Sequence, residues 1–308
     1  MCHYRCMPTT ADLARLRSEF ARGATSEHIA AEWSRLCVDE LRTALHGRTD
    51  AQVWVTGSLG RGEALPGSDL DALAVTATPD RGFDADALQV PGVVADPNGA
   101  TPLQRRLRRT PDDWRDAATR WAADPHTDRG VVMIGLLADA RPVGDTPDLD
   151  LPGVLAAAVR AHPLCLHAVL SDALAHRPHV RPAFPLVPAP SVDPKRDLLT
   201  PVRKLARWAA LAGGTGGYTT GERLTGARAG EFLDADEIAD LQRCHHEILD
   251  IVTRRALDGT GADGPVPLGG FRPAERATIR WVSRTVAGIQ RVLDYRLSAS
   301  SFTRPDSP

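Results

Sequence analysis

Apolar residues recur at helical spacing near the start of the chain. From residue 25 to residue 47 they lie three or four positions apart, with Ser26 in front as an N-cap and Gly47 behind as a stop. The repeating apolar positions are Ile29, Ala30, Trp33, Leu36, Cys37, Leu41 and Leu45. This pattern predicts an amphipathic helix over 25–47 that buries one face.

The pattern then changes to short runs rich in β-forming residues. Residues 52–56 (QVWVT) stop at Gly57, and residues 69–76 accumulate apolar side chains. Both runs are predicted strands. Residues 80–101 are rich in Gly, Pro and Asp, which predicts a loop that contains a short helix.

A helix and an apolar run follow. Thr110 is a capping residue and Pro111 suits the first helical position, so a helix is predicted from there to about Asp124. Residues 130–138 are apolar throughout, and we interpret them as a buried strand that delivers Asp139 at its end.

Beyond residue 142 the chain has long helical patterns and no convincing strand. The predicted helices lie near 151–176, 198–212, 219–229, 234–258 and 272–298. The sequence therefore predicts an α+β protein, with a mixed sheet flanked by helices and then an all-helical bundle. The predicted boundaries are an N-terminal segment at 1–24, the α/β domain at 25–147, the helical domain at 148–300 and a disordered tail at 301–308.

Net charge, cysteine content and the N-terminal sequence exclude only a few classes of protein. The formal net charge of −2 gives no reason to expect nonspecific binding to nucleic acid or to an anionic membrane. The five scattered cysteines argue against a disulfide framework, and no apolar stretch follows the N-terminus as in a signal peptide. We expect a cytoplasmic protein without a membrane partner.

Candidate chemistry centres on two carboxylates. Asp69 and Asp71 are two positions apart on a predicted strand, so both project from the same face. Two acids held side by side repel each other unless a cation lies between them, and Mg²⁺ prefers oxygen ligands. Paired acids on a surface strand are also often merely solvated, so the pair alone does not establish a metal site.

The residues before this pair strengthen the metal interpretation. Gly57-Ser58 forms a predicted turn from a strand into a short helix, which presents backbone N–H groups to a phosphate. Asp139, at the end of another predicted strand, is placed to be the third acid. The expected site thus binds a triphosphate and Mg²⁺ (or Mn²⁺) through Asp69, Asp71 and Asp139.

Several cations could contact the nucleotide. Arg61 is a candidate phosphate contact, and Glu63 is expected to orient Arg61 rather than bind metal. Lys195, Arg207 and Arg223 in the helical part could supply further positive charge, although such residues are often ordinary helix-surface charges.

These motifs resemble a known superfamily. The run GSLGRGE at 57–63 followed by SDLD at 68–71 looks like the signature of the DNA polymerase beta nucleotidyltransferases. The resemblance is closest to the bacterial signal-transduction nucleotidyltransferases that occur fused to CBS and cyclic-nucleotide-binding domains. These are related to PII uridylyltransferases and glutamine synthetase adenylyltransferases. The run DARPVGD at 139–145 resembles that family's element before its helical part, which supports Asp139 as the third carboxylate.

The resemblance implies a Mg²⁺-dependent nucleotidyltransferase that uses ATP or UTP. Its acceptor would be a protein in signalling or nitrogen-type regulation. Two alternatives stay open: nucleotidylation of a small molecule, as with aminoglycosides, and a non-catalytic nucleotide sensor. A nucleic-acid acceptor is not expected, because no basic stripe with interleaved aromatic residues is visible.

Overall fold

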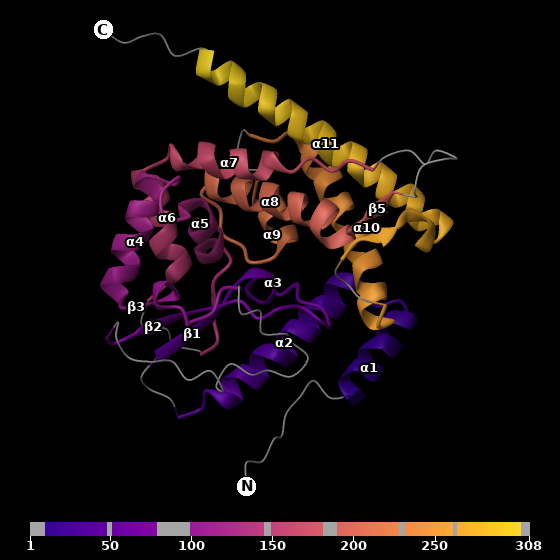
Figure 1. Ribbon diagram of the computed structural model, residues 1–308, viewed down its shortest axis with the longest axis horizontal. Coiled ribbons are helices and arrows are strands. Elements are labelled where there is room, and N and C mark those ends of the chain that lie inside the picture. Colours follow the sequence, from indigo (N-terminus) through magenta and orange to yellow (C-terminus); the bar gives the residue numbers. More distant parts are fainter. Residues whose placement is uncertain are drawn as a thin grey trace. The chain divides into compact units, whose positions relative to one another are not determined.

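The computed structural model describes residues 10–47, 51–78, 99–144, 149–180, 190–227, 232–260 and 264–302. The contacts divide the chain into two compact units, one of residues 1–165 with 253–262 and one of residues 166–252 with 263–308 (Figure 1). The predicted loop at 80–101 and the predicted tail at 301–308 lie mostly outside the described residues. The architecture is α+β, as predicted.

The first unit contains a sheet of four strands. They are β1 (Ala51–Val55), β2 (Ala72–Thr76), β3 (Arg108–Arg109) and β4 (Arg141–Pro142), in the order β3-β2-β1-β4. β1 pairs antiparallel with β2 and β4, and β2 pairs parallel with β3. Both predicted strands are therefore present, but the second begins at Ala72 instead of Asp69.

Two helices share a hydrophobic cluster with this sheet. α1 (Thr10–Ala21), which the sequence pattern did not predict, packs with α2 (Ser26–Ala44). Their buried residues form one cluster with alternate residues of β1, namely Leu16, Ile29, Trp33, Leu41, Val53 and Val55. The N-cap of α2 is Thr25, whose side chain accepts a hydrogen bond from the His28 backbone N–H, and not Ser26 as predicted.

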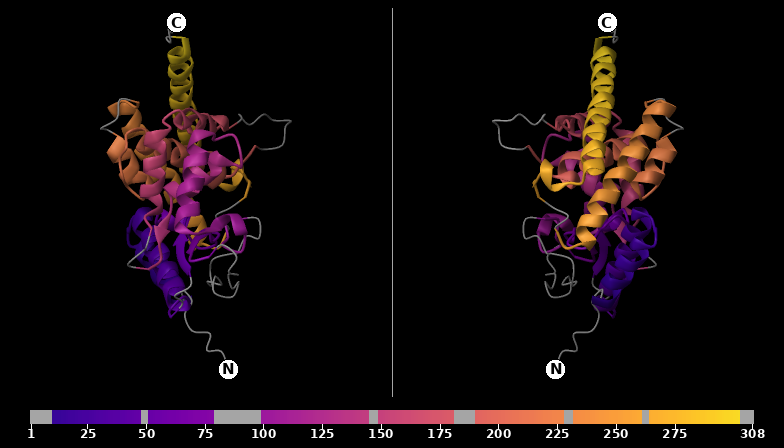
Figure 2. Two further views of the ribbon diagram at one scale, coloured as in Figure 1. Left: turned by 90° about the vertical axis from the view of Figure 1, so that its left-hand side faces the viewer. Right: turned by 90° about the vertical axis from the view of Figure 1, so that its right-hand side faces the viewer.

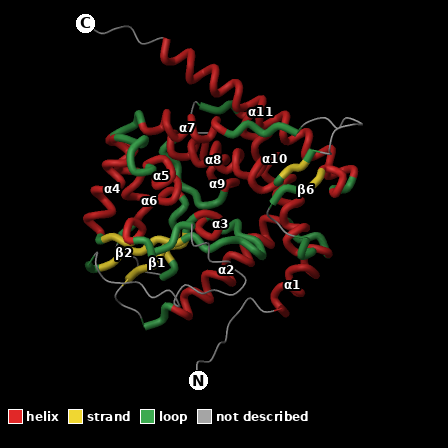
Figure 3. Tube along the Cα trace, in the orientation of Figure 1, coloured by secondary structure: helices red, strands yellow, loops and turns green. Residues whose placement is uncertain are grey.

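Three further helices of this unit are α4 (Pro111–Ala123), α5 (Gly130–Ala138) and α6 (Leu151–Ala161). The cap of α4 is as predicted, since Thr110 accepts a hydrogen bond from Asp113 N–H. Trp114 of α4 ties this layer to the sheet by donating from Nε1 to the Ala74 carbonyl at 3.0 Å. Figure 3 shows the helices and the sheet as separate layers.

Residues 130–138 were predicted to be a strand, and this was wrong. They form α5, which packs against α4 and α6. A short apolar run buried on most sides has no periodicity that separates a strand from a helix. Asp139 therefore follows a helix, as its C-cap residue.

The helix predicted over 151–176 is also broken. It forms α6, which packs on α4 and α5 in the first unit, and α7 (Cys165–Ala175). Pro163 lies in the break, and a proline disfavours helical backbone at the residue before it.

The second unit is mostly helical. Its elements are α7, the π-helix Pro194–Leu199, α8 (Thr200–Ala212), α9 (Thr220–Gly226), α10 (Ala235–Leu257), which continues into the first unit, and the long α11 (Pro273–Phe302, Figure 2). The side-chain amide of Gln290 on α11 donates to the carbonyls of Ala173 and His176. A two-stranded ribbon, β5 (Ser191–Val192) with β6 (Val266–Pro267), is present where no strand was predicted.

Across the described parts of the chain, no single helix is both long and apolar enough to cross a membrane.

Candidate active site

The turn after β1 brings glycine backbone against a carboxylate. α3 (Gly57–Gly60) begins directly after Thr56, and Gly57 has φ +60°. A Cβ atom on Gly57 would lie 2.6 Å from Oδ2 of Asp71. Both the backbone conformation and the close approach therefore require glycine at this position.

Asp69 and Asp71 precede β2 instead of lying within it. Both are half-buried, whereas Leu70 and Ala72 beside them are buried, so the two carboxylates share the more open side of the chain. The alternation that was predicted from strand spacing is thus present in the extended segment that leads into the strand.

Asp71 is held from several directions. Its backbone carbonyl accepts a hydrogen bond from Thr56 N–H at 2.9 Å, and its Oδ1 accepts one from Ala100 N–H at 3.0 Å. Its Oδ2 faces Gly57. The carboxylate is therefore fixed between the Gly57 turn and the segment at Ala100.

Arg61 is the centre of a buried ionic cluster. Arg61, Glu63 and Asp139 are only 6%, 5% and 1% exposed. Arg61 Nε pairs with Glu63 Oε2 at 3.1 Å, and its Nη1 pairs with Asp139 Oδ2. Burial alone would lower the pKa of Arg61, but the charges of Asp139 and Glu63 more than offset it and the pKa is raised. Arg61 therefore stays charged, and Glu63 orients it as predicted.

Gly60 closes the same cluster from the backbone side. A Cβ atom there would overlap the Asp139 carbonyl oxygen and lie 2.9 Å from the Val55 carbonyl oxygen. α3 thus packs directly on the backbone of β1 and on the residue after α5, which positions Arg61 opposite Asp139.

The three predicted metal ligands are not gathered into one group. Within the described ranges, no cluster of three or more His, Cys, Asp or Glu side chains is arranged to hold a metal ion. The carboxylate of Asp139 is instead occupied by Arg61. Asp69 and Asp71 still suit a divalent cation, because they supply oxygen donors on one side of the chain and Asp71 is preset against Gly57. The role of all three acids as metal ligands stays a prediction.

A pocket of about 200 Å³ opens beside Asp71. It is lined by Asp71, Gly99, Ala100, Arg106, Leu107, Arg129, Val132, Met133 and Leu136. Arg106 and Arg129 were not singled out from the sequence. Arg129 belongs to no sequence motif that points to a binding site. In the structure, Asp128 and Arg129 both have positive φ, of +47° and +57°.

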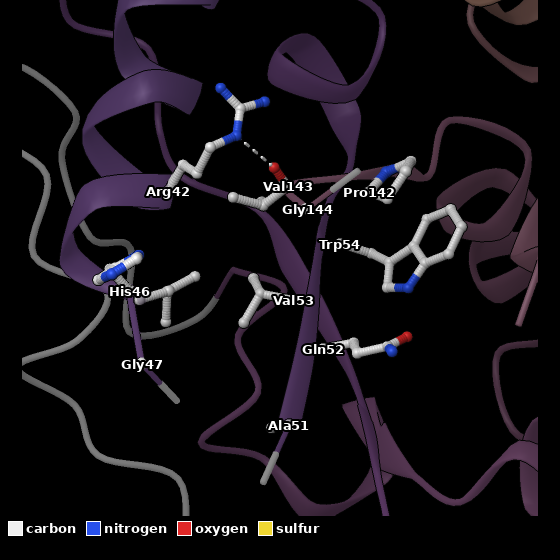
Figure 4. A pocket seen from close by; sticks show the side chains of 11 residues that line it. Arg42, His46, Gly47, Ala51, Gln52, Val53, Trp54, Pro142, Val143 and Gly144 are labelled. Atoms are coloured by element: carbon white, nitrogen blue, oxygen red, sulfur yellow. Dashed lines mark hydrogen bonds between the residues drawn. The ribbon is translucent and has the colours of Figure 1, made fainter. Parts of the chain in front are cut away.

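A second pocket, of about 260 Å³, lies at the edge of β1 (Figure 4). Arg42, His46 and Val53 line it, and Arg42 Nε donates to the Val143 carbonyl at 3.1 Å. It includes none of the predicted site residues.

The three predicted cations of the helical part belong to the second unit. Lys195 lies in the π-helix, Arg207 in α8 and Arg223 in α9. Arg223 is 2% exposed and donates from Nε to the Gly217 carbonyl at 3.1 Å. A nucleotide contact by these residues stays a prediction.

Two family models match the chain. Residues 37–109 match the model described as "Nucleotidyltransferase domain", and residues 165–297 match the one described as "Putative nucleotidyltransferase substrate binding domain". No curated protein matches the chain. The first match contains Gly57, Asp69 and Asp71, while Asp139 lies between the two matches.

Proposed function

We propose that this chain, which carries a nucleotidyltransferase domain, transfers a nucleoside monophosphate from a nucleoside triphosphate to an acceptor hydroxyl, and that Asp69, Asp71 and the Gly57 turn form its donor site. The observation that carries the proposal is the Asp71 carboxylate, held by Ala100 N–H and set against a glycine that tolerates no Cβ. Such a fixed carboxylate beside a helix start suits a polyphosphate and its cation.

In the proposed reaction the acceptor oxygen forms a bond to the α-phosphorus. The bond from that phosphorus to the β-phosphate bridging oxygen breaks, pyrophosphate leaves, and the hydroxyl proton is released. Asp69 and Asp71 would hold Mg²⁺, which when bound neutralises charge on the triphosphate. Ser58 and the backbone of the Gly57 turn would position the phosphates, since placement and charge neutralisation supply most of the catalysis in phosphoryl-type transfer.

The buried cluster of Arg61, Glu63 and Asp139 would support the donor site without contacting the substrates. Arg61 is enclosed by Glu63 and Asp139, so we assign it the role of holding α3 and the Gly57 turn in place. Asp139 would then be a positioning residue in this arrangement. The alternative role, in which Asp139 binds the metal, predicts that Asp139→Asn loses the metal dependence of ATP binding.

A protein in signalling or nitrogen-type regulation is the proposed acceptor, following the resemblance to PII uridylyltransferases and glutamine synthetase adenylyltransferases. Lys195, Arg207 and Arg223 lie in the match to the substrate-binding domain and would contribute positive charge there.

The test is incubation of the protein with each labelled nucleoside triphosphate, Mg²⁺ and host lysate. Label should pass to an acceptor with the wild type and be lost with Asp69→Asn/Asp71→Asn. Asp112→Asn is the matched control, because that carboxylate is 92% exposed on α4 and should leave transfer unchanged. Equal transfer by the double variant would refute the proposal. Metal-dependent triphosphate binding without transfer would favour a nucleotide sensor.

A further inference from the structure

The pocket beside Asp71 adjoins the proposed donor site on one side only. Asp71 directs Oδ2 toward Gly57, and its Oδ1 accepts from Ala100, which lines the pocket. One fixed carboxylate therefore contacts both the Gly57 turn and the pocket. A group bound in the pocket lies next to the site where transfer is proposed, without occupying the turn.

The pocket carries positive charge at its rim. Arg106 and Arg129 both line it and both are exposed. Arg106 is steadied by Gln104, which accepts from its Nε at 2.9 Å. Arg129 lies at the N-cap of α5, where it makes no side-chain capping hydrogen bond and where the helix dipole also favours an anion. These groups select for a negatively charged ligand group.

The backbone at Arg129 supports a role in binding. Asp128 and Arg129 both adopt positive φ, which is uncommon for residues other than glycine. Such geometry is retained only where the surroundings fix it, and it occurs preferentially at ligand sites. Here it directs the chain into α5 at the rim of the pocket.

The remaining wall is apolar and small. Leu107, Val132, Met133 and Leu136 line it, and Val132 is 57% exposed. The volume of about 200 Å³ compares with the roughly 150 Å³ that holds a benzene molecule. The wall therefore suits an apolar body of about one ring and a substituent.

We propose that this pocket binds the acceptor, and that the acceptor presents a small apolar body carrying a carboxylate or another anion, with Arg106 and Arg129 binding the anion. This inference rests on the proposed function, since it places the acceptor next to the donor site. It makes the anion and the apolar body the features by which the acceptor is recognised, whether they belong to a small molecule or to a protein side chain and its neighbours.

The experiment measures binding of benzoate, with benzyl alcohol as its uncharged counterpart, by titration calorimetry or ligand-observed NMR. Wild type should bind benzoate in the millimolar range and benzyl alcohol at least tenfold more weakly. Arg129→Gln and Arg106→Gln should each weaken benzoate about tenfold, as for loss of a charge-assisted hydrogen bond. Arg105→Gln is the matched control, because Arg105 is exposed and does not line the pocket.

Binding of Mg²⁺-ATP to the same variants separates this proposal from the proposed function. The dissociation constant for ATP should stay within twofold in Arg106→Gln and Arg129→Gln, and saturating benzoate should not displace ATP. Competition between the two, or an equal loss of ATP binding in these variants, would place the triphosphate in the pocket and overturn the proposal. Absence of benzoate binding to wild type at 10 mM, roughly the weak limit for such a fragment, would overturn it as well. Failure of ATP binding in wild type would instead count against the donor site.

Discussion

Arg61 offers the sharpest test of how the donor site is held. Arg61→Met removes both of its ion pairs and leaves the carboxylates of Glu63 and Asp139, 5% and 1% exposed, without that partner. Removing one member of a buried ion pair typically costs about 3–5 kcal/mol. For a unit of this size that corresponds to a fall in melting temperature of about 6–20 °C. Asp139→Asn keeps the Arg61–Glu63 pair and should cost less, about 1–3 kcal/mol.

The cost should also depend on pH. Without Arg61 the two buried negative charges of Glu63 and Asp139 lose the cation that pairs with both. The loss of stability should therefore be largest near pH 7 and shrink toward pH 4, as both carboxylates become neutral. Arg115→Met is the control, because Arg115 is 52% exposed in its pair with Asp112 and should change stability by no more than about 0.5 kcal/mol.

Denaturation followed by tryptophan fluorescence suits this measurement. Four of the six tryptophans, Trp33, Trp54, Trp114 and Trp121, lie in the first unit. A cost below about 1 kcal/mol for Arg61→Met, or one that does not fall with pH, would refute the cluster as the support of the turn. Asp139→Asn should retain Mg²⁺-dependent ATP binding below its melting temperature, whereas loss of the metal dependence alone would make Asp139 a ligand.

Four further outcomes are expected. Gly57→Ala should lower the rate of nucleotidyl transfer about a hundredfold in a transfer assay, because its Cβ displaces the Asp71 carboxylate. Gly60→Ala should destabilise the fold by about 3 kcal/mol or more, measured by thermal denaturation. Glu40→Gln should stabilise the protein by a few tenths of a kcal/mol at pH 7 and not at pH 4, because burial and two neighbouring acids raise the pKa of Glu40; a gain that persists at pH 4 would contradict this. Burial raises the pKa of the Cys37 thiol to about 12, so in a Cys2→Ser/Cys6→Ser background Cys37 should resist iodoacetamide at pH 8 until the protein unfolds, as mass spectrometry would show.

Local signals in the sequence account for the elements that were predicted correctly. The spacing of Ile29, Trp33 and Leu41 determines the buried face of α2, and Thr110-Pro111 determines where α4 begins. The Gly57 turn could also be predicted from the sequence, because a predicted strand that stops at Gly-Ser most often continues into a turn. Each of these features depends on residues within one or two turns of each other.

The errors come from features that depend on distant partners. The run 130–138 became a helix because α4 and α6 enclose it, and no residue inside the run signals that environment. The ribbon of β5 and β6 has two residues per strand, too few to show alternation. Arg106 and Arg129 line a pocket with Asp71 only because the fold brings them together. No sequence motif therefore predicts that they share a pocket.

The pairing of Arg61 with Asp139 changes what the acidic motif means. Three acids in a sequence invite a three-ligand metal site, but a carboxylate that neutralises a buried guanidinium is less available to a cation. The two acids that remain, Asp69 and Asp71, are the half-exposed ones, and only they lie on the open side of the chain. Burial therefore separates the acids into a pair suited to bind a cation and one suited to hold the turn. An isolated aspartate in a motif can be assigned to either role only when its partner is known.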